Sequence, residues 1–162
     1  MATSPPPGTV PELTGLLTRV AHVLRTRLTA ALAEIGLTPR EQCVLVHALQ
    51  AERTQIQLAE LTDTDKTTMV VTIDRLEKAG YAERRPCSTD RRARIIKVTE
   101  EGERVAAAGQ RIVDRVHAEV IASLGDPAGA DFAEALRRLA EGPLAEPVEC
   151  DRPVRRPRQM TR

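Results

Sequence analysis

The sequence predicts a mainly helical fold with one small two-stranded β hairpin, and three observations carry this prediction. Apolar residues recur at helical spacing over long stretches near both ends of the chain. Between these stretches, cap and turn residues mark the starts and ends of three short helices. Residues 81–98 contain two extended segments around a turn cluster. Aromatic residues make up 1% of the 162 residues, so the core has to consist of Leu, Val, Ile and Ala.

The first long helix is expected over residues 10–35, after a Pro-rich arm, residues 1–9, whose composition is typical of disorder. Gly36 is a suitable residue to end this helix. Its apolar stripe consists of Leu13, Leu16, Leu17, Val20, Leu24, Leu28, Ala31, Leu32 and Ile35.

Two short helices follow, and each has the same start signal. Residues 38–41, Thr-Pro-Arg-Glu, form a capping box with proline at the first helical position, which predicts a helix to about Leu49. Residues 54–57, Thr-Gln-Ile-Gln, repeat the capping-box pattern ahead of a helix through Leu61. Residues 62–64 are then expected to form a turn.

A third short helix and a hairpin complete this central part. Asp65 is expected to cap a helix that runs to Ala79 and ends at Gly80. The extended segments 81–85 and 94–98 flank the turn cluster 86–90 and predict the hairpin. Two short helices joined by a tight turn and followed by a hairpin are the pattern of a winged helix-turn-helix, here residues 37–98.

Two further helices are expected over residues 99–141, before a Pro- and Arg-rich tail, 142–162, that looks disordered. Thr99 precedes acidic residues suited to a first helical turn, and Asp126-Pro127 is expected to start the last helix. The terminal helices carry more apolar surface than one small DNA-binding head needs. We therefore expect dimerisation helices over 10–36 and 99–141 and a homodimer that binds half-sites about 10 bp apart. A monomeric bundle is the alternative, and gel filtration distinguishes the two.

The helix after Asp65 has one apolar face and one face suited to a DNA groove. Met69, Ile73 and Leu76 are spaced to face the core. The other faces carry small polar and apolar groups with flanking cations, which suit base edges, thymine methyls and phosphates. These outward residues are Lys66, Thr67, Val70, Val71 and Arg75.

Charge is concentrated in the same region. The whole chain has a formal net charge of +1, whereas the segment from Lys66 to Lys97 has nine cations and four anions, 9 − 4 = +5. A local basic module in a nearly neutral protein fits local binding to double-stranded DNA. The hairpin tip carries Asp90, Arg91 and Arg92, and an arginine on such a loop can enter a narrow minor groove.

The order of these pieces over residues 37–105 resembles the MarR family of bacterial regulators. The matching pieces are Leu37-Thr38 with Gln42, Gln57–Glu60, Asp65–Thr68, Asp74–Gly80, Glu83–Arg85, Asp90–Ala93 and Val98–Gly102. With its flanking helices the resemblance covers residues 10–141. It implies that Thr67 and Thr68 contact DNA, that Arg92 enters the minor groove with Asp90 positioning the wing, and that Arg75 contacts the backbone.

We therefore expect the DNA contacts to come from one set of residues. The set is Lys66, Thr67, Thr68, Val70, Val71, Arg75, Arg84, Arg85, Asp90, Arg91, Arg92 and Arg94. The chain also departs from the family, because Val70 and Val71 replace positions that are often polar or basic, so the operator sequence can differ. Asp63 stands where glycine is frequent in the family, so the turn is either looser or closed by a local bond from Asp63.

The resemblance also implies a small-molecule effector, bound between the dimer helices and the DNA-binding head. Candidate lining residues are His22, Arg25, Cys43 and His47, with no aromatic residue to stack on a phenolic ligand. Metal sensing is an alternative, since His22, His47 and His117 lie on three helices, although no pair has ligand spacing. Redox sensing is a second alternative, because Arg84 and Arg85 lie beside Cys87 and can lower its thiol pKa. Cys43 is expected to pack in the core.

Other classes of protein are disfavoured by what the sequence lacks. The apolar runs are too short and too charged for a membrane span, and the N-terminus lacks a signal pattern, so a cytoplasmic protein is expected. Three widely spaced cysteines form neither a disulfide framework nor a CxxC pair. An enzyme is disfavoured because there is no nucleophile-base pairing, Gly-rich phosphate loop or metal motif, and no cofactor is expected. An architectural DNA-binding protein remains an alternative, which competition with random DNA would identify.

Overall fold

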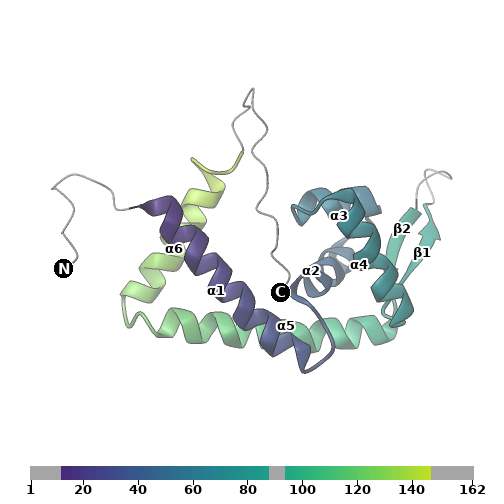
Figure 1. Ribbon diagram of the computed structural model, residues 1–162, viewed down its shortest axis with the longest axis horizontal. Helices are drawn as coiled ribbons and strands as arrows, with labels where there is room; N and C mark the ends of the chain where they lie inside the picture. The colour runs from purple at the N-terminus through teal and green to yellow at the C-terminus, as the bar shows by residue number, and fades with distance from the viewer. Residues whose placement is uncertain (1–11, 88–93, 147–162) are drawn as a thin grey trace. The chain divides into compact units, whose positions relative to one another are not determined.

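The computed structural model describes residues 12–87 and 94–146, which form α-helices and one antiparallel hairpin (Figure 1). The chain divides into two compact units, Met1–His117 and Ala118–Arg162. The N-terminal arm, the hairpin tip with Asp90, Arg91 and Arg92, and the tail from residue 147 lie outside the described residues. The elements are α1 (Leu13–Ala33), α2 (Pro39–Gln50), α3 (Gln55–Leu61), α4 (Lys66–Lys78), β1 (Ala82–Pro86), β2 (Arg94–Val98), α5 (Glu100–Ala122) and α6 (Ala128–Glu141).

The core of the first unit is aliphatic, as the composition predicts. It lies where the end of α1 meets α2, α3, α4, the hairpin and α5. The largest side chains with almost no exposed surface are Leu32, Val44, Leu45, Leu58, Met69, Ile73, Leu76 and Ile96. Each stands on the apolar face of its element, so burial of this one cluster fixes which side of α4 faces outward.

The two predicted capping boxes are present. The Glu41 N–H donates to Thr38 Oγ1 at 3.2 Å, and the Thr38 N–H donates to Glu41 Oε2 at 2.7 Å. Thr54 and Gln57 exchange the same pair of bonds at the start of α3. Both boxes satisfy backbone donors that would otherwise lack partners at the helix ends.

The turn after α3 is closed, and one of the two expected alternatives is therefore wrong. Asp63 has a positive φ of 47°. The N–H groups of Asp63 and Thr64 donate to the carbonyls of Glu60 and Ala59, at 3.2 and 2.9 Å. This is the Schellman pattern usually built on glycine, and Gly80 (φ 76°) forms the equivalent turn after α4. Asp63 adopts the left-handed conformation that its short polar side chain tolerates, so the turn is not loose.

The hairpin is fixed to the helices at its base. β1 and β2 pair antiparallel, with Ala82 opposite Val98 and Arg84 opposite Ile96. The Ile96 N–H also donates to the Arg53 carbonyl at 2.9 Å, which ties β2 to the loop before α3.

The start of α5 is also held at the base of the hairpin. The Thr99 hydroxyl donates to the Gly80 carbonyl at 2.7 Å and accepts the Gly102 N–H at 3.0 Å. Thr99 thus caps α5, as predicted, and attaches its first turn to the end of α4.

The predicted bounds of the long helices differ from the observed ones by a few residues. α1 begins at Leu13 and ends at Ala33, and α5 runs from Glu100 to Ala122. α6 begins at Ala128, and its N-cap, Pro127, makes no side-chain cap bond. None of the helices in the described part of the chain is long and apolar enough to cross a membrane.

Candidate nucleic-acid interface

The outward side of α4, here called the recognition helix, is exposed. Met69, Ile73 and Leu76 are buried as predicted, and Thr72 joins them. On the remaining surface Val70 and Val71 are 40% and 55% exposed. Lys66, Thr67, Arg75 and Lys78 are also exposed, whereas Thr68 is half-buried. The recognition helix therefore presents small apolar and hydroxyl groups with cations beside them, and its apolar face is used by the core.

Asp65 caps the recognition helix and is a fixed negative charge at its first turn. Asp65 Oδ1 accepts the Thr68 N–H at 2.8 Å. Hydrogen bonds from Thr68 lower the pKa of the Asp65 carboxyl from its ordinary value, which outweighs the opposing effect of desolvation. The carboxylate occupies the place where a helix N-terminus would otherwise attract another anion.

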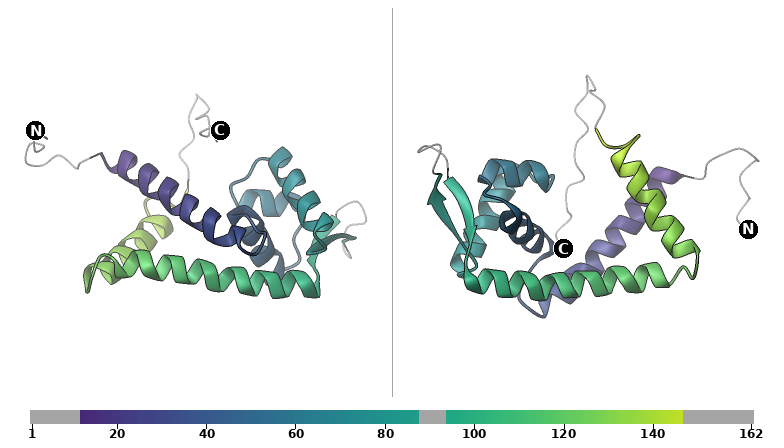
Figure 2. Two further views of the ribbon diagram at one scale, coloured as in Figure 1. Left: turned by 60° about the horizontal axis from the view of Figure 1, so that its bottom comes forward. Right: turned by 180° about the vertical axis from the view of Figure 1, so that it is seen from behind.

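Arg84 lies inside the protein's own ion-pair network rather than on an open surface. Its guanidinium pairs with Glu77, donates to Asp74 Oδ1 at 2.7 Å and donates to Gln55 Oε1 at 3.3 Å. Its backbone N–H donates to Glu77 Oε1 at 2.8 Å. One strand residue is thereby joined to both α3 and α4, and β1 lies alongside α4 (Figure 2).

Arg75 also has an internal partner, but it keeps most of its surface. Arg75 Nε pairs with Glu41 Oε1 at 3.1 Å, with side-chain exposures of 61% for Arg75 and 6% for Glu41. The second oxygen of Glu41 is used by the capping box of α2. Glu41 therefore holds one edge of the Arg75 guanidinium, and the rest of that group stays open to solvent.

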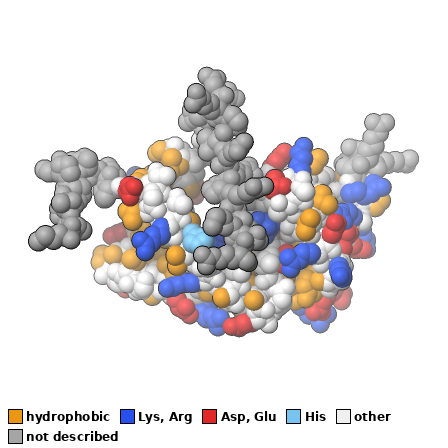
Figure 3. Space-filling model, viewed as in Figure 1, with side chains coloured by type: hydrophobic (Ala, Val, Ile, Leu, Met, Phe, Trp, Pro, Cys, Tyr) orange, Lys and Arg blue, Asp and Glu red, His pale blue; other side chains and the backbone are white. Residues whose placement is uncertain are grey.

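Two further residues predicted to contact DNA, Arg85 and Arg94, lie on the strands of the wing. Arg85 is half-exposed and pairs with Glu83 at 2.6 Å on its own strand, and Arg94 is exposed and also has a partner. Acidic side chains lie among the Lys and Arg side chains over this part of the surface (Figure 3). Among the described cations of this segment, Arg75, Arg84 and Arg85 thus have carboxylate partners in the protein. The net charge of the segment therefore overstates the number of unpaired cations.

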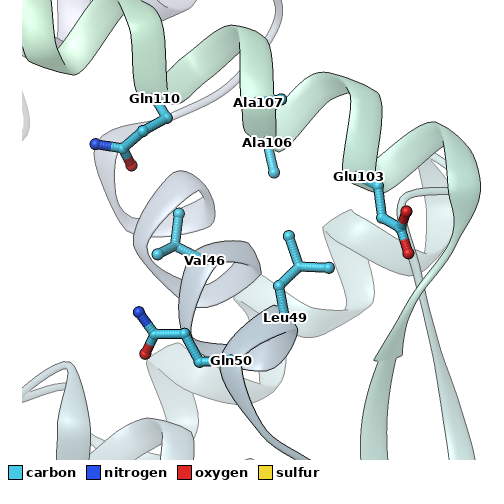
Figure 4. A pocket seen from close by; sticks show the side chains of 7 residues that line it. All are labelled: Val46, Leu49, Gln50, Glu103, Ala106, Ala107 and Gln110. Atoms are coloured by element: carbon cyan, nitrogen blue, oxygen red, sulfur yellow. The ribbon is translucent and has the colours of Figure 1, made fainter.

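A groove of about 380 Å³ lies between α2 and α5 (Figure 4). Apolar side chains line most of it, and Glu103 is its one charged lining residue. The lining residues are Val46, Leu49, Gln50, Glu103, Ala106, Ala107 and Gln110. None of the four predicted effector residues lines the groove. One of them, His47, contacts a lining residue, with 3.3 Å between His47 Nδ1 and Gln50 Oε1.

The groove cannot be recognised from the sequence, because its lining residues carry no chemical signature. The two helices approach closely where Gln42 Nε2 donates to the Ala106 carbonyl at 2.9 Å and Gly109 faces the same amide. A glycine inside a helix, such as Gly109, is a sequence signal of such a close approach.

None of the histidines and cysteines in the described part of the chain lines this groove. His22 and Arg25 are exposed on α1, and Cys43 is half-buried on α2, where burial raises the pKa of its thiol. A raised thiol pKa lowers the thiolate fraction and so disfavours oxidation at Cys43. Within residues 12–87 and 94–146, no three His, Cys, Asp or Glu side chains are grouped to hold a metal ion.

Comparison with known proteins gives consistent matches. The model of the MarR family matches residues 35–93. A transcriptional regulator of that family from Rhodococcus sp. RHA1 is 27% identical, with a TM-score of 0.70 over 81% of this chain and 96% of that chain. CouR from Rhodococcus jostii RHA1, solved with p-coumaroyl-CoA, is 28% identical, with a TM-score of 0.70 over 80% and 92% of the two chains. The repressor CouR bound to a 23-mer DNA duplex shares the fold, with 24% identity and a TM-score of 0.73 over 89% and 100% of the chains.

Proposed function

The chain belongs to the MarR family of winged helix-turn-helix transcriptional regulators, and from this we propose that it represses transcription as a homodimer on a pseudo-palindromic operator until a small molecule releases it. The observation that carries the proposal is the exposed outward side of the recognition helix, beside a hairpin fixed to it at the base. As a regulator of genes it acts where the DNA is, in the cytoplasm.

The exposed residues of the recognition helix suit a major groove. Thr67 offers a hydroxyl to base edges or phosphates, and the methyl groups of Val70 and Val71 suit thymine methyls. Lys66 and Arg75 supply charge for phosphates on either side. Arg92 and its neighbours Asp90 and Arg91, which lie outside the described residues, are proposed to extend the contact into the minor groove.

The proposal is tested by measuring how the protein binds the promoter next to its own gene, with excess random DNA as competitor. Specific binding survives the competitor, whereas an architectural protein is displaced from it. Thr67→Ala and Thr68→Ala should reduce discrimination between operator and random DNA more than they reduce overall affinity. Arg92→Ala should cost roughly 1–3 kcal/mol of binding free energy. Equal affinity of the wild-type protein for operator and random DNA contradicts the proposal.

An effector that enters the groove between α2 and α5 would act close to the DNA-binding head. Apolar walls with one carboxylate, Glu103, favour a neutral or cationic apolar molecule over an anion. Such an effector differs from p-coumaroyl-CoA, the ligand with which CouR was solved. Benzylamine, benzyl alcohol and benzoate form a matched probe set. We expect the first two to release operator DNA at lower concentration than benzoate, and Ala107→Phe to remove the response without changing DNA affinity. Release by benzoate at the lowest concentration contradicts this assignment.

A further inference from the structure

We propose that Arg84 is a positioning residue that sets the wing against the recognition helix and that it does not bind DNA phosphate. This inference rests on the proposed DNA-binding function. It replaces the sequence-based expectation that Arg84 is one of the DNA contacts.

The geometry around Arg84 joins three elements through one side chain. From β1, the guanidinium reaches Glu77 and Asp74 on α4 and Gln55, the first residue of α3. The backbone N–H of Arg84 adds a bond to Glu77. Because Asp74 and Glu77 are three residues apart, they lie on one face of α4. The forked guanidinium can therefore hold both carboxylates at once, which a lysine ammonium cannot do with the same geometry.

The local charge argues against a phosphate contact at this position. Arg84 contributes one positive charge and its two carboxylate partners contribute two negative charges, so the cluster is net negative. Only 27% of the Arg84 side chain is exposed. A phosphate approaching this group meets two anions that already use its donors, so little counterion release is expected from it.

By restraining the wing, the same network is expected to raise the affinity for DNA. A winged helix-turn-helix contacts DNA with a helix and a wing, and both must arrive with the correct spacing. If the wing is not held in place in the free protein, it has to become ordered when DNA binds. The free-energy cost of this ordering lowers the affinity for DNA. The link from Arg84 to Glu77 supplies this restraint at the root of the wing, two residues after β1 begins at Ala82.

Arg85 and Glu83 provide a matched control pair on the same strand. They form an ion pair with each other, with side-chain exposures of 52% and 43%. This pair is local to β1 and does not reach α4, so its loss removes charges without loosening the wing. Arg85, unlike Arg84, is open enough to contact a phosphate.

The first test measures operator affinity against salt concentration for Arg84→Lys, Arg84→Gln and Arg85→Gln. For both Arg84 variants we expect affinity to fall on the order of tenfold, because binding then has to order the wing, with an unchanged salt slope. For Arg85→Gln we expect the slope to fall by about 0.9 if it contacts a phosphate. Full affinity for Arg84→Lys, or a slope lowered by about 0.9 for Arg84→Gln, overturns the proposal.

The second test asks whether removing a negative charge near the DNA strengthens or weakens binding. Glu77→Ala removes an anion from the DNA-facing region, so electrostatics alone predicts tighter binding, whereas loss of positioning predicts weaker binding. We expect weaker binding for Glu77→Ala and tighter binding for the control Glu83→Ala. Tighter binding for Glu77→Ala overturns the inference. All variants are measured well below the melting temperature of the least stable one, so that incomplete folding does not mimic the loss.

Different results contradict the proposed function and the proposed role of Arg84. If wild-type protein does not prefer operator over random DNA, the proposed function is wrong. If wild-type protein has that preference and Arg84→Lys keeps full affinity, only the role of Arg84 is wrong.

Discussion

At the scale of single residues, Asp65 has two opposing effects on the recognition helix. Its carboxylate caps the helix by accepting the Thr68 N–H, and the same charge lies where DNA phosphates are expected. Asparagine is an equally good N-cap and carries no charge. A single substitution, Asp65→Asn, can therefore remove the charge and keep the capping hydrogen bond.

Asp65→Asn should keep the stability of the protein at neutral pH and raise its affinity for DNA. Asp65→Ala should lower the urea midpoint because the cap is lost. Because the pKa of Asp65 is lowered in the folded protein, the stabilisation by its carboxylate is complete at neutral pH. It is lost as the pH falls through the lowered pKa.

Urea unfolding of the wild type and Asp65→Asn across the acidic range, together with operator titrations, checks these expectations. The loss of stability in acid should be smaller in the variant. Equal acid sensitivity of the two proteins would show that the Asp65 carboxylate does not stabilise the helix.

At the scale of elements, the contact between the start of α5 and the turn after α4 depends on a glycine. A Cβ added at Gly102 would lie 2.0 Å from the Tyr81 carbonyl oxygen. That oxygen also accepts the Thr99 N–H at 3.1 Å, so the backbone there is held in place. Neither atom can move away without breaking the attachment of α5 to the hairpin.

Gly102→Ala should therefore destabilise the protein by about 1–3 kcal/mol, the range typical of overpacking in a tight contact. Gly15→Ala is the control, because the nearest atom to its added Cβ is 3.5 Å away, on Glu12. That substitution replaces glycine in a helix and should stabilise by up to about 1 kcal/mol. Chemical denaturation of both variants measures the difference. Similar stabilities for the two would contradict the tight contact at Gly102.

At the scale of the whole molecule, α1 carries an apolar stripe that is exposed in the single chain. Leu13, Leu16, Val20 and Val23 are each between 44% and 53% exposed and follow a spacing of three and four residues. Such a stripe is typical of a helix that packs against another helix. It supports the proposal that a second copy of the chain covers it.

The double variant Leu16→Glu and Val20→Glu should shift the protein from dimer to monomer, since two carboxylates would be buried in the interface. The control is Thr18→Glu, which lies on the opposite side of α1 and should leave the dimer intact. Sedimentation equilibrium gives the mass of each. A double variant that stays dimeric would place the dimer contact elsewhere.

The sequence by itself determined the order of the elements, the two capping boxes, the inward and outward sides of the recognition helix and the family. These features depend on residues within one or two helical turns of each other, such as Thr38 with Glu41, or Met69 with Ile73. Local hydrogen bonds and helical periodicity decide them before any tertiary contact forms.

Only the tertiary structure decided which charged residues are already paired and where the groove lies. Arg75 pairs with Glu41, and Arg84 with Asp74, Glu77 and Gln55, across intervals of 7 to 34 residues in the sequence. The groove likewise joins residues near 46–50 to others near 103–110. A count of charges treats every arginine alike, because the partner of a long side chain is set by how whole elements pack and not by its neighbours in the chain.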